Sequence, residues 1–89
     1  MNTNPATPWF VYILLCRNGS LYTGIAIDPH KRLLEHISGK GGAYTRSHPP
    51  VRIIYQETQP NRSVALKREA QIKRWSRRMK MKNLGLSIF

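Results

Sequence analysis

The 89-residue sequence predicts a small α+β domain, in which a three-stranded antiparallel sheet is flanked by helices. Two apolar runs, 9–16 and 21–27, are rich in aromatic and β-branched residues and flank the turn signal Asn18-Gly19, as in a β-hairpin. A third such run covers 51–57, and helix start and stop signals mark the segments around it. A chain of this length has room for one domain with a modest core.

The hairpin loop decides which side chains share a face of the sheet. A two-residue loop, Asn18-Gly19, would place Tyr12 and Tyr22 on opposite faces, because side chains alternate with period two. A three-residue loop, with Gly19 in the left-handed conformation, would pair Leu14 with Tyr22 and bring both tyrosines to one face. We favour the three-residue loop. On composition alone, both tyrosines could equally be ordinary strand residues.

A first helix follows the hairpin. Asp28 is a typical N-cap, Pro29 suits the first helical position, and Gly39 ends the helix. Arg32 and His36 are four residues apart, so they are neighbours on one helix face and can reach the same ligand. The expected apolar stripe on another face consists of Leu33, Leu34 and Ile37.

The segment 38–50 contains three glycines and two prolines, which predict a loop without regular structure. Such a loop can bring backbone N–H groups close to a phosphate, and its side chains add charge, hydroxyls and a stacking surface. The alternative is a plain connector, but a loop this long is unusual in so short a chain without a role. The predicted nucleic-acid contacts are Lys40, Tyr44, Thr45 and Arg46.

The third strand, 51–57, is expected to place Val51, Ile53 and Tyr55 on one face. After a turn, Ser63 is a suitable N-cap for a second helix that runs from 64 to about 80. The expected apolar stripe of this helix consists of Val64, Ala65, Ile72, Trp75 and Met79.

Charge dominates the composition, with 15 Lys and Arg against 4 Asp and Glu and a net charge of +11. This balance predicts an anionic partner, and nucleic acid fits best because a phosphate backbone rewards dispersed cations through counterion release. A membrane is not expected, since no stretch is a spanning helix. A basic chain without a specific partner remains the alternative. With one cysteine, Cys16, the chain has no internal disulfide and no thiolate zinc site.

The region from 62 to 82 holds nine basic residues and one acidic residue, Glu69. Arg68 falls between apolar positions, so its guanidinium either snorkels or projects into a cleft. We expect Arg68, together with Arg74, Arg77 and Arg78, to contact nucleic acid.

Glu69 stands at the edge of the apolar stripe, where its carboxylate can face the sheet. The other acidic residues are less suited to hold a cation, because Asp28 acts as a cap and Glu35 and Glu57 lack a supporting set. The alternative for Glu69 is a surface ion pair with Lys73, worth about 0.3–0.5 kcal/mol.

These residues together resemble the GIY-YIG nuclease family. Val11-Tyr12 stands in place of the I-Y of the first family motif, and Tyr22-Thr23-Gly24 in place of Y-x-G. Arg32 and His36 follow Tyr22 by ten and fourteen residues, which is the family pattern, and Glu69 completes the set. The resemblance covers about residues 9–80 and is closest to the small stand-alone bacterial members.

The loop at 41–45 is also similar to that of the junction-cleaving, structure-specific nucleases of this family. Two positions depart from the pattern. Phe10 stands where the family name has its first Gly, and Asn83 is only a loose candidate for a late Asn.

The resemblance implies a metal-dependent endonuclease that hydrolyses DNA phosphodiester bonds. Selectivity for DNA structure and a role in DNA repair or recombination are further expectations. Tyr12 would be the base or water-orienting residue, helped by Tyr22 and His36, and Arg32 would bind the scissile phosphate. Glu69 would hold one Mg²⁺ or Mn²⁺. Because free tyrosine titrates near 10, cationic neighbours would have to lower the pKa of Tyr12. The alternative is a non-catalytic nucleic-acid-binding module with the same fold.

The sequence leaves RNA open as a substrate and leaves the oligomeric state undetermined. Since no recognition helix or zinc finger is apparent, a protein partner could supply targeting. We expect a flexible lead-in at 1–8, the domain at 9–82 and an apolar tail at 83–89. Because no positive segment followed by an apolar core is found near the start, we expect no signal peptide and a cytoplasmic protein.

Overall fold

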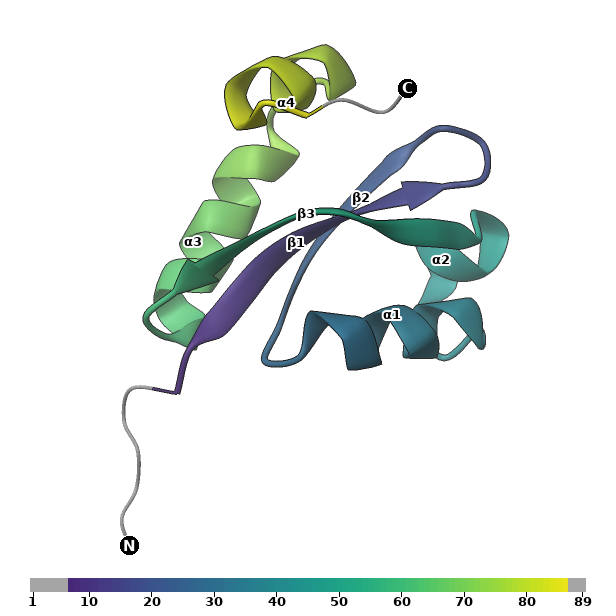
Figure 1. Ribbon diagram of the computed structural model, residues 1–89, viewed down its shortest axis with the longest axis horizontal. Coiled ribbons are helices and arrows are strands. Elements are labelled where there is room, and N and C mark those ends of the chain that lie inside the picture. Colours follow the sequence, from purple (N-terminus) through teal and green to yellow (C-terminus); the bar gives the residue numbers. More distant parts are fainter. Residues whose placement is uncertain (1–6, 87–89) are drawn as a thin grey trace, which may run out of the picture.

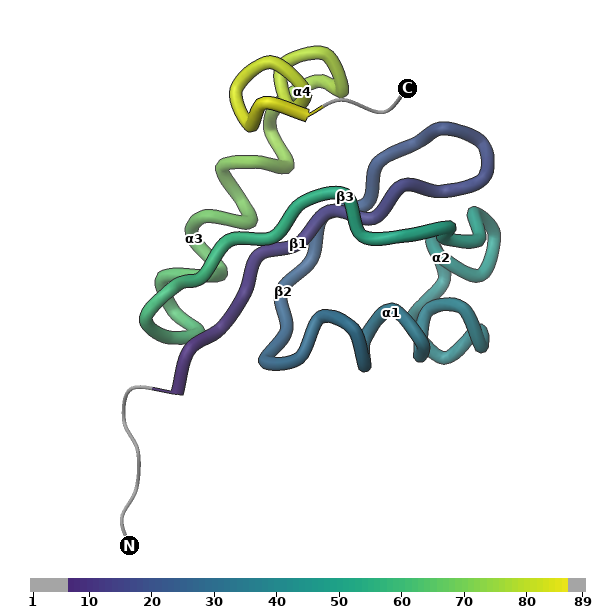
Figure 2. The backbone as a smooth tube through the Cα atoms, in the orientation of Figure 1, coloured from purple at the N-terminus to yellow at the C-terminus, as the bar shows by residue number. Residues whose placement is uncertain are grey.

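The computed structural model describes residues 7–86, which form three strands and four helices around one antiparallel sheet (Figure 1). Within the sheet the order is β2-β1-β3, so β1 is the central strand. The α1 and α3 helices lie on opposite sides of the strands, as the backbone tube also shows (Figure 2). The predicted α+β class is confirmed. The elements are β1 (Trp9–Cys16), β2 (Leu21–Ala26), α1 (Pro29–Ile37), α2 (Ala43–Ser47), β3 (Pro50–Gln59), α3 (Arg62–Lys73) and α4 (Arg77–Leu84).

The hairpin between β1 and β2 has the three-residue loop. Leu14 pairs with Tyr22, and the Cys16 N–H donates to the Ser20 carbonyl at 2.9 Å. Gly19 has a φ of +84°, a conformation in which a Cβ would be strained. Tyr12 and Tyr22 therefore lie on the same face of the sheet, as predicted.

Each face of β1 contributes to a separate apolar cluster. On the α3 side, Val11 and Ile13 pack with Ala65 and Ile72 of the helix. The cluster on the α1 side contains Tyr12, Leu14 and Ala26, with Tyr22, Leu33 and Ile53 packed against it. Cys16 is buried at the end of β1, as expected of an apolar thiol. The central strand thus carries both the core of the fold and the first tyrosine.

β3 departs from simple alternation. Its register against β1 shifts near the middle of the strand, which leaves Ile54 as an extra residue. Ile53 packs on the α1 side, whereas Ile54 and Tyr55 pack on the α3 side. The predicted shared face for Val51, Ile53 and Tyr55 is therefore wrong, because a bulge inverts the alternation at one residue and residue types do not reveal it.

The first helix has the predicted ends but not the predicted buried side. The Asp28 carboxylate accepts from the Lys31 N–H at 3.2 Å. Leu34 and Ile37 are 66% and 54% exposed, while His36 is 1% exposed. The apolar stripe on α1 is therefore wrong in two of its three positions. The helix presents its histidine to the sheet because the facing strands carry tyrosine hydroxyls that need polar partners.

The segment predicted to lack regular structure contains the short helix α2. Gly42 has a φ of +124°, which lets the chain turn sharply into the helix. Thr45 in α2 is buried against α1. Tertiary packing of this kind can stabilise one turn of helix that the glycines and prolines around it would not favour alone.

The predicted helix 64–80 is two helices with a different start. Asn61, not Ser63, is the N-cap, and its side chain accepts from the Val64 N–H at 2.9 Å. Asn and Ser are about equally good N-caps, so residue types alone do not choose between the two positions. A second cap at Ser76 starts α4, so that α3 ends before Trp75.

The predicted lead-in and tail lie only partly within the described residues. Residues 1–6 of the predicted lead-in and 87–89 of the predicted tail lie outside the described residues. Leu84 and Leu86 pack against the cluster on the α3 side. Within residues 7–86, no helix has the length and apolarity that a membrane span requires.

A hydrogen-bonded network ties β3 to α3. The Glu57 carboxylate accepts from Arg68 Nε at 2.9 Å, from the Tyr55 hydroxyl at 2.5 Å and from Gln59 Nε2 at 2.6 Å. The Arg68 guanidinium also lies 5.4 Å from the Trp75 ring centroid. Burial alone would raise the pKa of Glu57, but these hydrogen bonds outweigh it and lower the pKa.

Replacing Glu57 with glutamine should flatten the pH dependence of stability. The folded pKa lies below the ordinary value of 4.5, so the carboxylate stabilises the fold above that pH and the stabilisation disappears as the pH falls through the folded pKa. We expect the wild-type free energy of unfolding to decline more steeply than that of Glu57→Gln from about pH 5 to pH 3. Urea unfolding across this range measures both slopes, and equal slopes would contradict the expectation.

Candidate active site

Three side chains that the sequence singled out meet on the α1 side of the sheet. The ring centroids of Tyr12 and Tyr22 are 6.5 Å apart, and His36 lies 5.1 Å from Tyr22 in an edge-on arrangement. Tyr12 Oη is 3.0 Å from His36 Nε2. The two strands of the hairpin and helix α1 thus converge on one polar cluster.

Gly24 makes room for the buried Tyr12 ring. It pairs directly with Tyr12 across the two strands. A Cβ at position 24 would come 2.6 Å from Tyr12 Oη and 2.7 Å from Cζ, closer than any real contact. A glycine in β2 is therefore a requirement of the site, because any side chain would push the tyrosine aside.

Gly24→Ala should displace Tyr12 and destabilise the domain. The methyl group has no free space, so we expect a loss of about 1–3 kcal/mol in the free energy of unfolding, as for other overpacked cores. Chemical denaturation measures the loss, and the Tyr12–His36 contact can be followed by NMR. Wild-type stability with an unchanged contact would show that β2 can move away without cost.

Tyr12 is electrostatically unusual. Burial raises the pKa of its hydroxyl to about 12, Tyr22 and Glu69 act in the same direction, and Arg32 opposes them. The expected lowering by cationic neighbours is therefore not found, because desolvation of the phenolate outweighs the attraction of the guanidinium. Tyr12 is a neutral hydroxyl near pH 7 in this protein.

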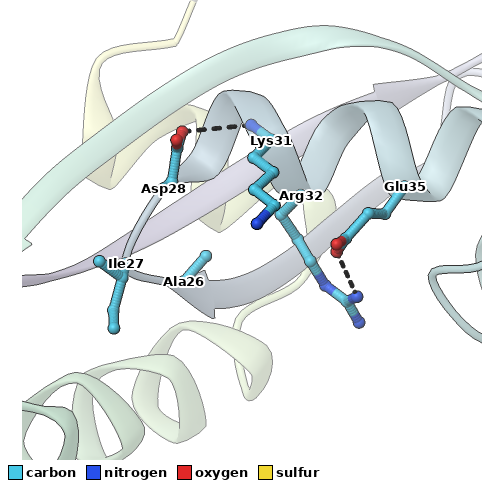
Figure 3. A pocket seen from close by; sticks show the side chains of 6 residues that line it. All are labelled: Ala26, Ile27, Asp28, Lys31, Arg32 and Glu35. Carbon is cyan, nitrogen blue, oxygen red and sulfur yellow. Dashed lines mark hydrogen bonds and ion pairs between the residues drawn. The ribbon is translucent and has the colours of Figure 1, made fainter.

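Arg32 borders an open cavity of about 400 Å³ at the start of α1 (Figure 3). One guanidinium nitrogen donates to Glu35 at 2.9 Å and the other to the Gly41 carbonyl at 3.2 Å. The Arg32 side chain is 37% exposed, so solvent or a ligand can still reach it. The cavity is lined by Ala26, Ile27, Asp28, Lys31, Arg32 and Glu35.

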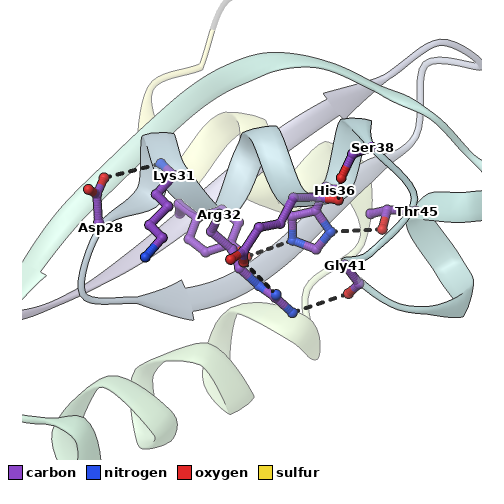
Figure 4. A network of polar contacts seen from close by, with 9 residues as sticks. Asp28, Lys31, Arg32, His36, Ser38, Gly41 and Thr45 are labelled. Carbon is purple, nitrogen blue, oxygen red and sulfur yellow. Dashed lines mark hydrogen bonds and ion pairs between the residues drawn. The ribbon is translucent and has the colours of Figure 1, made fainter.

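His36 is bonded through both ring nitrogens. Besides the contact to Tyr12, Nδ1 lies 2.7 Å from Thr45 Oγ1. Burial and the nearby Arg32 charge lower the pKa of His36, while Glu35 raises it. The imidazole is therefore mostly neutral at pH 7, and it links Tyr12 to α2 (Figure 4).

The segment around α2 divides between the cluster and the surface. The Tyr44 ring stacks between Tyr22, at 5.7 Å, and His48, at 4.3 Å. Its hydroxyl donates to Ser20 Oγ in the hairpin loop at 2.8 Å. Thr45 points inward, whereas Lys40 and Arg46, also predicted to bind nucleic acid, are exposed.

Glu69 is the remaining acidic residue that could bind a cation. Its side chain is 16% exposed, and its carboxylate forms an ion pair with Lys73 Nζ at 3.3 Å. This ion pair is the alternative role expected from the sequence. Glu69 stands on α3, which packs on the other side of the sheet, and its charge has the smallest of the effects on the pKa of Tyr12. Asp28 caps α1, and Glu35 and Glu57 accept hydrogen bonds from arginines.

The donor set fits a hard cation only in a minimal way. Among the described residues, no three His, Cys, Asp or Glu side chains are grouped as a metal site would require. Mg²⁺ is nevertheless often bound by one or two carboxylates, with waters and substrate phosphates as its other ligands. Glu69 meets that minimum.

The predicted basic contacts lie at different places in the fold. Arg74, Arg77 and Arg78 are exposed around the start of α4, and Arg77 Nε donates to the Gly19 carbonyl at 3.0 Å. Arg68 is held by Glu57, so a contact from Arg68 to nucleic acid would have to compete with that pair. All three exposed arginines are distant in sequence from the residues of the polar cluster, and Arg77 is bonded to the hairpin loop.

Sequence reasoning missed several residues that complete the cluster. Glu35 and Gly41 hold Arg32, Ser20 holds Tyr44, and His48 extends the ring stack. Only the Gly-Gly pair at 41–42 carried a detectable signal. Partners such as Ser20 are invisible in the sequence because tertiary folding brings them together from 24 residues away.

The chain is similar to a known family of proteins. A model of the GIY-YIG catalytic domain matches residues 8–82. A UPF0213 protein of Staphylococcus epidermidis is 51% identical over 73 residues, which cover 82% of this chain and 89% of that protein. A UPF0213 protein of Xanthomonas axonopodis pv. citri is 43% identical over 74 residues, covering 83% of this chain and 72% of that protein. These names state no activity.

Two solution structures share the fold. The UPF0213 protein BH0048 from Bacillus halodurans is 38% identical, with a TM-score of 0.56 over 88% of this chain and 83% of that chain. The protein EF2693 from E. faecalis is also 38% identical, with a TM-score of 0.62 over 94% of this chain and 86% of that chain. The resemblance found in the sequence is confirmed: the chain belongs to the GIY-YIG nuclease domain family and is similar to its small UPF0213 members.

Proposed function

We propose that this protein is a metal-dependent endonuclease that hydrolyses DNA phosphodiester bonds. The observation that carries the proposal is the convergence of Tyr12, Tyr22, Arg32 and His36 on one face of the sheet. The charge of Glu69 acts on the same hydroxyl. A binding surface alone would not require a buried tyrosine bonded to a buried histidine.

Each residue of the cluster has its own role in the proposed reaction. The half-exposed Arg32 guanidinium binds the oxygens of the scissile phosphate, for which its planar fork is well suited. Once Tyr12 has released its own proton to solvent, its phenolate orients the attacking water and accepts one proton from it as the new bond to phosphorus forms. The bond from phosphorus to the leaving oxygen breaks, that oxygen takes a proton from solvent, and His36 holds the Tyr12 oxygen in place. Tyr22 packs beside both rings and keeps bulk water away from them.

A divalent cation held by Glu69, with Mg²⁺ or Mn²⁺ as the candidates, would neutralise charge on the phosphate and reverse the sign of the local charge that Tyr12 senses. This second effect matters because Tyr12 titrates near 12 in the protein alone. Arg32 and His36 act by their positions. Arg32 binds the phosphate, and His36 holds the Tyr12 hydroxyl.

The positive charge of the protein favours DNA as the substrate, and it would also suit RNA. The exposed residues Lys40, Arg46, Arg74, Arg77 and Arg78 offer positive charge to a phosphate backbone. Selection by DNA shape, as in repair or recombination intermediates, or by a protein partner is part of the proposal.

The test is incubation of the purified protein with branched, nicked, single-stranded and duplex DNA and with RNA, in Mg²⁺, Mn²⁺ or chelator. We expect metal-dependent cleavage, with branched or nicked DNA preferred over plain duplex. Binding to all substrates without cleavage of any would overturn the proposal.

The second candidate is a nucleic-acid-binding module that retains the fold without cleavage. Two observations favour it: the raised pKa of Tyr12 and the engagement of Glu69 by Lys73. A module of this kind would bind DNA with a strong dependence on salt concentration, and neither Glu69 nor Tyr12 would affect its affinity.

A further inference from the structure

Thr45 is predicted from the sequence to contact nucleic acid, yet its side chain lies inside the protein. It is 2% exposed, and Oγ1 is 2.7 Å from Nδ1 of His36. The opposite ring nitrogen, Nε2, is 3.0 Å from Tyr12 Oη. A continuous hydrogen-bonded chain therefore runs from α2 through the histidine to the tyrosine (Figure 4).

The number of protons in this chain limits its arrangement. Thr45, neutral His36 and Tyr12 each carry one proton, and only two gaps separate them. One terminal hydroxyl must therefore direct its hydrogen away from the chain. Within residues 7–86 the Thr45 hydroxyl has no hydrogen-bond partner other than His36. If the Thr45 hydroxyl directed its hydrogen away from His36, that hydrogen would be buried without an acceptor.

The other end of the chain is better suited to the outward hydrogen. Tyr12 is also buried, at 1% exposed, but its neighbour Arg32 borders the open cavity, so this end of the chain lies beside a space that a ligand can enter. In the proposed reaction this is the side from which water and phosphate approach. An outward hydrogen on Tyr12 therefore finds a partner when the substrate is bound.

We propose that Thr45 is a positioning residue whose hydroxyl donates to His36 Nδ1 and so fixes the tautomer with its proton on Nε2. In this tautomer the Nε2–H points at Tyr12 Oη and stabilises the phenolate that forms when Tyr12 releases its proton to solvent, before it accepts a proton from the water. The inference rests on the proposed nuclease function and deepens it. It reassigns Thr45 from the nucleic-acid interface to the support of a catalytic side chain.

Gly41 supports the same geometry. A Cβ at this position would overlap the His36 ring at Nδ1, so a glycine is needed for Thr45 and His36 to approach. The Gly41 carbonyl also accepts from Arg32 at 3.2 Å. The segment 41–45 thereby holds both Arg32 and His36, and its glycine serves this packing.

Two substitutions separate the hydroxyl from the shape of the side chain. Thr45→Val keeps the shape and removes the hydroxyl, whereas Thr45→Ser keeps the hydroxyl. Ser47→Ala removes an exposed hydroxyl from the same helix and is the matched control. The ¹⁵N NMR signals of the imidazole nitrogens report the tautomer, with His30 and His48 as internal references.

We expect a protonated Nε2 on His36 in the wild type, Thr45→Ser and Ser47→Ala, and loss of this single pattern in Thr45→Val. The turnover of Thr45→Val should fall about 10–100-fold, as for other residues that orient a functional histidine, and its DNA affinity should change less than about twofold. Thr45→Ser should restore most of the turnover.

Several results would overturn the inference. They are a wild-type proton on Nδ1, an unchanged tautomer and turnover in Thr45→Val, or equal defects in folded Thr45→Ser and Thr45→Val. Weaker DNA binding with normal turnover would return Thr45 to the interface. The NMR readout needs no cleavage, so a Thr45-dependent tautomer in a protein that cleaves nothing would sink the nuclease proposal alone.

Discussion

Replacing Glu69 with alanine should reduce metal-dependent cleavage to the level seen with chelator. The other three acidic residues are engaged as a helix cap or by arginines, so no carboxylate can take over at the cluster. We expect a loss of at least about a thousandfold in turnover, equivalent to roughly 4 kcal/mol of transition-state stabilisation. Gel-based cleavage under single-turnover conditions measures it.

The control for Glu69→Ala is Lys73→Ala, which removes the ion-pair partner and keeps the carboxylate. This variant should cleave at saturating DNA as the wild type does. Salt-dependent DNA binding by Glu69→Ala should stay nearly unchanged, because removal of a negative charge does not remove a phosphate contact. Equal cleavage by Glu69→Ala and the wild type would end the assignment of this residue as the metal ligand.

Arg32→Ala should lower turnover far more than affinity. The guanidinium reaches the cavity beside α1 and is fixed by Glu35 and Gly41, so it is preorganised for charge that builds up at the phosphate. We expect turnover to fall about 10²–10³-fold and the dissociation constant for DNA to rise less than about fivefold. Cleavage assays with and without saturating DNA separate these effects.

Two further variants sharpen the Arg32 experiment. Arg32→Lys keeps the charge but loses the fork, so it should recover only part of the turnover. Arg78→Ala removes an exposed arginine remote from the cluster along the chain and should weaken binding and the salt dependence while sparing turnover at saturation. If Arg32→Ala instead showed the pattern expected of Arg78→Ala, the binding module would be the better description of the protein.

The sequence alone determined the scaffold of the candidate site. Alternating apolar residues around Asn18-Gly19 specified the hairpin, and a glycine able to adopt positive φ selected the loop that puts both tyrosines on one face. The Asp28 cap and Pro29 fixed where α1 begins, and therefore where Arg32 and His36 lie along it. These features follow from local backbone chemistry, which residue types encode directly.

Only the tertiary structure decided which way the remaining side chains face. The inward position of Thr45 and the bulge at Ile54 depend on contacts between distant segments, and no local pattern encodes them. The pKa of Tyr12 also depends on tertiary packing. Nearby cations suggested a lowered pKa, but burial of the hydroxyl raises the pKa instead. Desolvation depends on everything packed around a group, so it appears only once the chain has folded.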